Sequence, residues 1–165
     1  MKREQLTPPS YGEYWQDQGG IVVDFVPSMG GNPGWYLILP TDAKSENTGI
    51  AWGPKDTDVV GASSEWDGLA NTLALAAHPT PHPAARWARG LEIESHRDFY
   101  IPSRREQRLL WARVPEQFKP RWYWSSTQYS RRTAWGQHFD DGTQGDLGKG
   151  CQGHVRAVRR FTLSA

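Results

Sequence analysis

The chain has 165 residues, of which 37% are hydrophobic and 12% aromatic, and its formal net charge is +1. This length suits a single domain with a substantial core, because each aromatic side chain can bury roughly 150–250 Å². The single cysteine, Cys151, excludes an internal disulfide and a zinc site built from cysteines. No apolar run approaches the ~18–20 residues that a membrane helix needs, so we expect no membrane insertion. We also predict no cofactor.

Basic residues are concentrated in the second half of the chain. Residues 1–80 contain four Lys or Arg and ten Asp or Glu, whereas residues 81–165 contain fifteen and eight. Clustered basic residues are typical of nucleic-acid-binding proteins, but here the arginines are dispersed and no nucleic-acid motif accompanies them. The pattern favours pairing of the basic part with the acidic part, or across a subunit contact.

The first twenty residues are expected to form an arm that is separate from the domain at 21–165. Residues 1–10 are polar and contain prolines, and they lack the apolar core of a signal peptide. The aromatic residues Tyr11, Tyr14 and Trp15 follow. Such a cluster either closes the core or docks on a neighbouring subunit, and the sequence leaves both alternatives open.

A β-hairpin is predicted next. Residues 21–26 and 35–39 are β-branched or aromatic, and residues 27–34 between them are rich in turn formers. Residues 40–61 show no periodicity and are expected to form a loop, with Trp52 as a plug beneath it.

Three helices are expected in the middle of the chain. Ser64 opens the first, with Asp67 as an incomplete capping box, and His78 ends it. Its apolar positions follow helical spacing at Trp66, Leu69, Ala70, Leu73, Ala76 and Ala77. A short helix is predicted over 83–90, with proline in its first turn and glycine past its end. Ser103 and Glu106 form a full capping box for the third, which Pro115 stops.

Three strand-like runs close the chain, over 123–129, 134–139 and 155–160. The longest gap between them, Asp140 to Gly153, has five glycines and almost no apolar residue. Rigid strands that hold up long polar loops are typical of a protein that presents those loops to a ligand.

These motifs resemble a known family when they are taken in order. Asp98–Glu106 (DFYIPSRRE) is similar to the "W-x-LPS-x-x-E" element of the DUF1566 (Lcl C-terminal-like) domain, 123–129 (YWSSTQY) to its "YWSST" strand, and 155–159 to its terminal "VRAVR". Residues 67–72 and 82–85 resemble elements of a phage and prophage branch, which extends the likeness over most of 20–161. The chain departs from the family in having Phe-Tyr-Ile where "WYL" is common, and in a short segment before the YWSST strand.

The resemblance implies an α+β, C-type-lectin-like fold, with two main helices packed on small twisted antiparallel sheets and long polar loops. It further implies a non-enzymatic protein of a phage tail tip or tail fibre, made in the bacterial cytoplasm and located in the virion. The expected partners are a host surface receptor, either a glycan or a protein, and other tail proteins, with a homotrimer as the assembly. Two alternatives remain: a structural tail or baseplate component, and a bacterial ligand-binding or adhesin-like domain.

Several residues suggest chemistry that the surrounding sequence does not support. The hydroxyls of residues 125–127 lack a G-x-S-x-G elbow, so we expect them to satisfy the sheet backbone and predict no catalytic residue. Trp124 is expected in the core, whereas Trp135 could equally stack on a sugar. The aspartates at 140, 141 and 146 could bind calcium, but a solvated acidic turn is the default. The five histidines lack the spacing of a zinc site.

Arg156, Arg159 and Arg160 could bind an anionic ligand, but we expect Arg156 and Arg159 to hold the last strand through acids or carbonyl groups. Binding residues should then come from the exposed loops. The first candidate patch contains Ser130 together with Gln128, Tyr129, Arg131 and Arg132, and the second contains Trp135, Gln137, His138, Thr143, Gln144, Asp146 and Lys149. Tyrosine and arginine among small polar residues are typical of adaptable binding surfaces.

Overall fold

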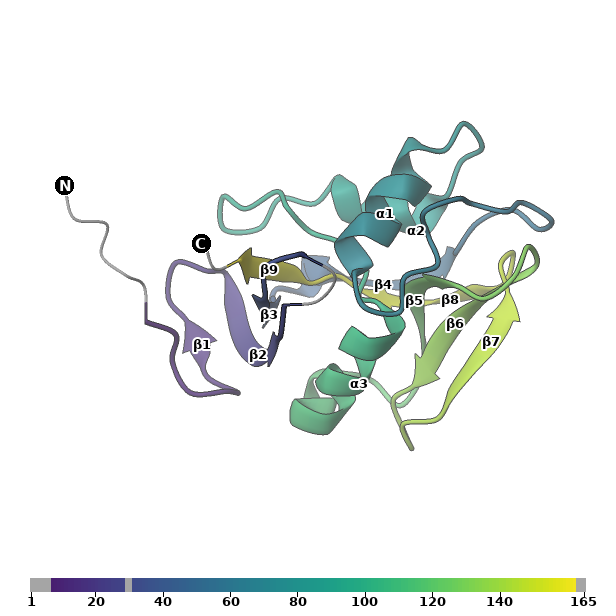
Figure 1. Ribbon diagram of the computed structural model, residues 1–165. Helices are drawn as coiled ribbons and strands as arrows, with labels where there is room; N and C mark the ends of the chain where they lie inside the picture. The colour runs from purple at the N-terminus through teal and green to yellow at the C-terminus, as the bar shows by residue number, and fades with distance from the viewer. Residues whose placement is uncertain (1–6, 29–30, 163–165) are drawn as a thin grey trace.

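The computed structural model describes residues 7–28 and 31–162, which form three α-helices and nine strands in two sheets (Figure 1). The helices are α1 (Gly68–Ala77), α2 (Pro83–Arg89) and α3 (Arg104–Arg113). The four-stranded sheet has the order β1 (Tyr14–Trp15), β2 (Gly20–Val26), β3 (Trp35–Leu39), β9 (Arg159–Thr162). The five-stranded sheet has the order β4 (Glu46–Ala51), β8 (Gln152–Arg156), β5 (Trp122–Gln128), β6 (Thr133–His138), β7 (Gln144–Gly148). The predicted α+β class is confirmed.

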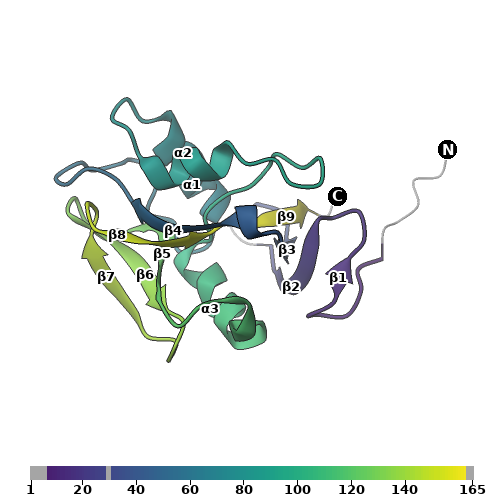
Figure 2. The same ribbon diagram turned by 180° about the vertical axis from the view of Figure 1, so that it is seen from behind.

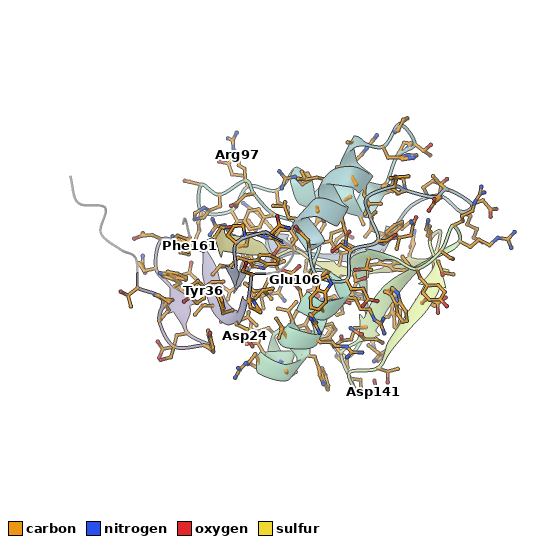
Figure 3. The ribbon with its side chains drawn as sticks, viewed as in Figure 1. Asp24, Tyr36, Arg97, Glu106, Asp141 and Phe161 are labelled. Atoms are coloured by element: carbon orange, nitrogen blue, oxygen red, sulfur yellow. The ribbon has the colours of Figure 1, made fainter. Side chains whose placement is uncertain are left out.

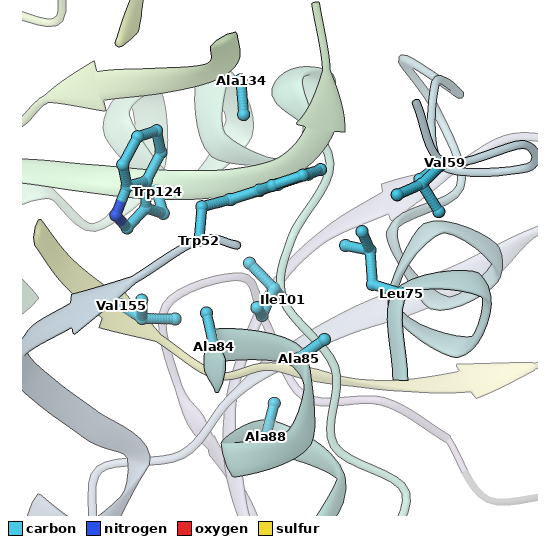
Figure 4. Close-up of a cluster of buried hydrophobic side chains, with 11 residues drawn as sticks. Trp52, Val59, Leu75, Ala84, Ala85, Ala88, Ile101, Trp124, Ala134 and Val155 are labelled. Carbon is cyan, nitrogen blue, oxygen red and sulfur yellow. The ribbon is translucent and has the colours of Figure 1, made fainter. Parts of the chain in front are cut away.

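The helices lie on opposite faces of the five-stranded sheet, as both ribbon views show (Figures 1 and 2). Neighbouring residues of β5 point to the two faces, because side chains alternate along a strand. Trp124 is buried with Leu75 of α1 and the alanines of α2, a cluster drawn in Figure 4. Tyr123 is buried on the other side, with Leu110 of α3 and residues of the four-stranded sheet. The expectation that Trp124 belongs to the core is therefore confirmed.

The predicted opening hairpin is confirmed, since β2 and β3 pair antiparallel with a bulge after Val22. In the aromatic cluster before it, the alternative of closing the core is confirmed for Trp15. Trp15 is 4% exposed and packs against Tyr36 and Phe161, so it closes the core. Tyr11 and Tyr14 are 45% and 42% exposed. β1 belongs to the sheet, although it falls within the predicted arm; residues 1–6 of that arm lie outside the described residues.

The three helices are confirmed, but the first one begins later than predicted. Its N-cap is Asp67, whose side chain accepts a hydrogen bond from the Ala70 amide at 3.0 Å. Ser64 instead caps the turn before the helix, accepting from the Trp66 and Asp67 amides at 3.2 and 2.9 Å. The capping box of Ser103 and Glu106 is present in full at the start of α3.

Glu106 is fully buried at the centre of the molecule (Figure 3). Its Oε1 accepts hydrogen bonds from the Ser103 and Gly68 amides, both at 3.1 Å. Its Oε2 accepts from the Tyr100 hydroxyl at 2.6 Å and the Trp35 indole at 3.2 Å. Burial raises the pKa of the Glu106 carboxyl, and the nearby Arg160 guanidinium opposes that shift. One carboxylate thus joins the starts of two helices to the four-stranded sheet.

Three strand assignments differ from the prediction, two of them in the closing region. The glycine-rich stretch after Phe139 is not one long loop, because β7 lies within it and pairs with β6. The run predicted over 155–160 is two strands, β8 and β9, in different sheets. The 40–61 segment contains β4, which pairs antiparallel with β8.

The expected sheet geometry is also wrong in one detail. β5 and β8 run parallel, joined at Tyr123 and His154, whereas purely antiparallel sheets were expected. The plug prediction for Trp52 is confirmed, because its buried indole donates to the Ser125 carbonyl at 2.8 Å. No helix within residues 7–28 and 31–162 has both the length and the apolar character for crossing a membrane.

Replacing Glu106 by glutamine should destabilise the protein by about 3 kcal/mol. Whichever carboxylate oxygen becomes the amide nitrogen, that nitrogen faces two donors, and Arg160 loses a buried counter-charge. Urea unfolding followed by tryptophan fluorescence would measure the change.

The matched control is Glu116→Gln, because Glu116 is exposed. We expect that variant to stay within about 0.5 kcal/mol of the wild type. An equally small effect of Glu106→Gln would contradict the role given to the buried carboxylate.

Candidate functional site

Three of the predicted binding residues are not on the surface. Gln128, Gln137 and Lys149 are 6%, 0% and 0% exposed, so the expectation that they lie on exposed loops is wrong. Gln128 spans the loop at 58–63: its Nε2 donates to Asp58 at 3.0 Å, and its Oε1 accepts from the Val59 amide at 3.0 Å. Gln137 accepts a hydrogen bond from Gln144 at 2.9 Å. The Gln128 amide therefore satisfies interior groups.

Lys149 is held by the same buried network. Its Nζ donates to Gln128 Oε1 at 2.7 Å and to the Thr57 carbonyl at 2.6 Å, and it lies 5.0 Å from the centre of the Trp52 ring. Burial lowers the pKa of Lys149 to about 8, with Asp58 opposing and Arg131 adding to the shift. This lysine therefore belongs to the interior of the protein.

The turn between β5 and β6 lies on the surface. Tyr129 is 58% exposed, and Arg131 and Arg132 are also exposed. Both arginines reach Asp56: Arg131 donates to its carbonyl at 2.9 Å, and Arg132 pairs with its carboxylate at 2.9 Å. The loop at 56 thus holds this turn in place.

The β6–β7 hairpin carries the second patch. Thr143 and Asp146 are exposed, and His138 is half-buried. Asp141, at the tip of the hairpin in Figure 3, accepts a hydrogen bond from the Thr143 amide at 2.9 Å, which lowers the pKa of that carboxyl. Within the described ranges, no three His, Cys, Asp or Glu side chains gather as a metal site.

The structure does bring Trp135 and Gln144 together with the start of α3. The Arg104 guanidinium stacks on the Trp135 ring, 3.5 Å from its centre, while Tyr129 meets the same ring edge-on at 5.1 Å. Gln144 Oε1 accepts from Arg104 Nε at 2.9 Å and from Arg108 Nε at 2.8 Å. Trp135 and Gln144, two predicted binding residues, are therefore neighbours of arginines that were not predicted to bind.

A second arginine–tryptophan stack lies beside the first. The Arg105 guanidinium is 3.5 Å from the centre of the Trp66 ring, and Glu65 pairs with Arg104 at 3.0 Å. We call Trp66, Arg104, Arg105, Arg108 and Trp135 the arginine–tryptophan face. The i, i+1, i+4 spacing of the arginines on a capped helix could have indicated a basic patch there. The two tryptophans come next to that helix only in the folded chain.

The arginine–tryptophan face is hollowed. A depression of about 100 Å³ is lined by Glu65 and the three arginines of the face. A larger one, of about 360 Å³, shares Arg105 and Arg108 and continues over apolar side chains, namely Phe25, Val26, Pro27, Trp66 and Leu109. A third, of about 240 Å³, shares Trp66 and extends to Trp35 and Asp67. This face can therefore contact an extended ligand with both charged and apolar groups.

The remaining arginines of the closing strands serve the scaffold. Arg159 pairs with Asp98 at 2.8 Å and donates to the Gln18 carbonyl at 2.8 Å. Arg156 donates to the Pro40 carbonyl at 2.7 Å, and Arg160 pairs with Asp67 at 3.0 Å. The structural role predicted for Arg156 and Arg159 is confirmed.

The role predicted for the β5 hydroxyl groups is confirmed for Ser125 and Thr127. Ser125 Oγ donates to the Trp135 carbonyl at 2.7 Å, and Thr127 Oγ1 donates to the Ser64 carbonyl at 2.9 Å. These hydroxyls therefore satisfy backbone groups.

A comparison with protein-family models and one with curated proteins both returned no match. The resemblance of the sequence motifs to the DUF1566 family therefore stays a prediction.

Lys149 gives the protein a defined alkaline pH dependence. A lysine whose folded pKa lies below its unfolded value binds fewer protons in the native state, so stability rises with pH between the two values. From a folded pKa of about 8, wild type should gain about 2 kcal/mol over Lys149→Met between pH 7.5 and 10. Urea unfolding of both proteins at each pH would measure this difference.

The comparison between the two proteins removes the titration of other groups. Lys55→Met is the control, because Lys55 is exposed; its stability difference from wild type should stay flat over the same range. A flat difference for Lys149→Met would contradict the lowered pKa.

Proposed function

We propose that this chain is a non-enzymatic binding protein of a phage or prophage tail, carried at the tail tip or fibre, that binds a host cell-surface receptor. The observation that carries the proposal is the arginine–tryptophan face, together with the neighbouring turn at Tyr129. The tail location and the C-type-lectin-like fold come from the resemblance of the sequence motifs.

The chemistry of the face supports binding. Indole rings offer large, stiff contact surfaces, and guanidinium groups offer directed hydrogen bonds, the two properties enriched where a few residues carry most binding energy. Trp66 and Trp135 are half-buried beneath stacked arginines, which limits the rotamers that each side chain would lose on binding. The face is therefore ordered before a ligand arrives.

The fold also agrees with what the resemblance implies. β9 pairs with β3, so the last strand joins the opening hairpin in one sheet. The two ten-residue helices, α1 and α3, are the main ones, as expected. These features support the proposed C-type-lectin-like fold, although the parallel β5–β8 pair is a departure from the expectation.

A structural tail component is the second candidate, and one observation favours it. Tyr14 lies in β1, the edge strand of the four-stranded sheet, and Tyr11 precedes it by three residues; both side chains are exposed. Exposed aromatic residues on a sheet edge suit a contact with another subunit or another tail protein, including the proposed homotrimer. This surface is separate from the residues of the arginine–tryptophan face, so both roles can coexist.

The paired change Trp66→Ala and Trp135→Ala should weaken binding to the receptor about 30-fold or more, as expected for anchor residues. The probe is fluorescently labelled protein on an array of whole bacteria and their isolated envelope polysaccharides and proteins.

Leu73→Ala is the control, because Leu73 is an exposed apolar residue of α1 outside the face. Its binding should equal that of wild type. Wild-type binding that survives both tryptophan changes would refute the proposed face, and the absence of this chain from purified tail particles by electron microscopy would refute the tail location.

A further inference from the structure

We infer that the arginine–tryptophan face is a site for an acidic saccharide, whose phosphate or carboxylate group binds between Arg105 and Arg108 while its sugar ring lies in the adjoining apolar depression. This inference rests on the proposed function and names the chemical class of its ligand. It is carried by the positions, contacts and charges of three arginines.

The arginines occupy positions where a helix disfavours them. Arg104, Arg105 and Arg108 lie in the first two turns of α3, whose N-terminal end carries a partial positive charge. Carboxylates stabilise that end of a helix and cations destabilise it. The acid in this turn, Glu106, points into the core and is fully buried. Residues that oppose the local preference of their helix are expected at functional sites.

The positive charge of this face is not balanced by neighbouring acids. Glu65 is the acid that lines the 100 Å³ depression, and it pairs with Arg104. Arg105 and Arg108 make no ion pair with any residue in 7–28 or 31–162. Two guanidinium groups thus stand side by side without a counter-charge, an arrangement that an oxyanion would relieve.

Each of these two guanidinium groups is fixed by one contact with a neighbouring side chain. Arg105 lies flat on Trp66, and Arg108 donates from Nε to Gln144 at 2.8 Å. Within the described part of the chain, no hydrogen bond engages the terminal nitrogens of either residue. Free terminal N–H groups on fixed guanidinium planes match the oxygens of phosphate and carboxylate, which arginine binds in a two-pronged way.

The neighbouring apolar surface favours a sugar over a free ion. Arg105 and Arg108 border the 360 Å³ depression that Trp66, Phe25 and Leu109 also line. Apolar side chains beside a charged pocket can pack against the C–H face of a pyranose ring whose acidic substituent reaches the arginines. Nucleic acid is the alternative source of phosphate, but bases need exposed aromatic faces for stacking. Here the guanidinium groups of Arg104 and Arg105 already cover a face of each tryptophan.

Isothermal titration with matched pairs of saccharides tests the inference. One pair is a phosphorylated lipopolysaccharide core oligosaccharide and its dephosphorylated form; the other is a polyuronate fragment and its carboxyl-reduced form. Wild type should bind at least one acidic member about tenfold or more tightly than its neutral partner, with affinity falling as salt rises. Which pair responds distinguishes phosphate from carboxylate.

The double variant Arg105→Gln, Arg108→Gln should lose that preference, and Arg105→Lys, Arg108→Lys should keep only part of it, because lysine lacks the planar fork. Arg86→Gln is the matched control, since Arg86 is an exposed arginine of α2 outside the face. Unchanged thermal unfolding of the variants would show that they are folded.

The outcomes separate this inference from the proposed function. Binding of acidic and neutral members with equal affinity, unaffected by the glutamine variant, would overturn the inference and leave receptor binding standing. A preference for single-stranded DNA or RNA over every saccharide would overturn it as well. No binding to any envelope component would overturn both.

Discussion

The fold depends on one buried carboxylate, that of Glu106. Four donors from three parts of the chain converge on its two oxygens, and the arrangement fixes the starts of α1 and α3 against Trp35 and Tyr100. The fit is close: a Cβ at Gly68 would lie 2.6 Å from Glu106 Oε1, so this position needs glycine. Arg160 completes the centre by stacking on Trp35 at 3.6 Å, which brings in the last strand. A buried charge is tolerated here because every lone pair that faces the core has a donor.

The same constraint determines where the arginines point. Glu106 is the third residue of α3 and must face inward to complete the capping box and the buried network. Residues one position before and two positions after it on a helix then face away from the core. Arg105 and Arg108 occupy those positions, while Arg104 turns toward Trp135. The stability of the core and the exposure of the arginine–tryptophan face therefore have a common origin in the rotation of one helix.

Much of the scaffold was predictable from local patterns, and the rest depends on contacts distant in sequence. Ser103 and Glu106 gave a strong helix signal because a capping box spans only four consecutive residues. β4 and β7 were missed because their residues, ENTGIA and QGDLG, have low strand propensity; pairing with β8 and β6 makes them strands. Lys149 was placed on the surface because lysine is rarely buried, yet the carbonyl of Thr57, 92 residues away, accepts a hydrogen bond from its ammonium group. The arginine–tryptophan face was missed for a similar reason, since Trp66 and Trp135 are adjacent to α3 only in the folded chain.

Polar groups in this protein are of two kinds, and the difference bears on function. Those inside, such as Gln128, Lys149 and Arg159, are engaged by protein partners on several atoms, so they add little capacity to bind anything else. Arg105 and Arg108 are each fixed by one side-chain contact, while their terminal nitrogens make no hydrogen bond within the described residues. A scaffold gains nothing from two adjacent, uncompensated cations at the positive end of a helix, where each costs a fraction of a kcal/mol. An anionic partner that supplies the missing charge would account for their placement, which is why we propose the binding role for this face rather than for the glycine-rich hairpin.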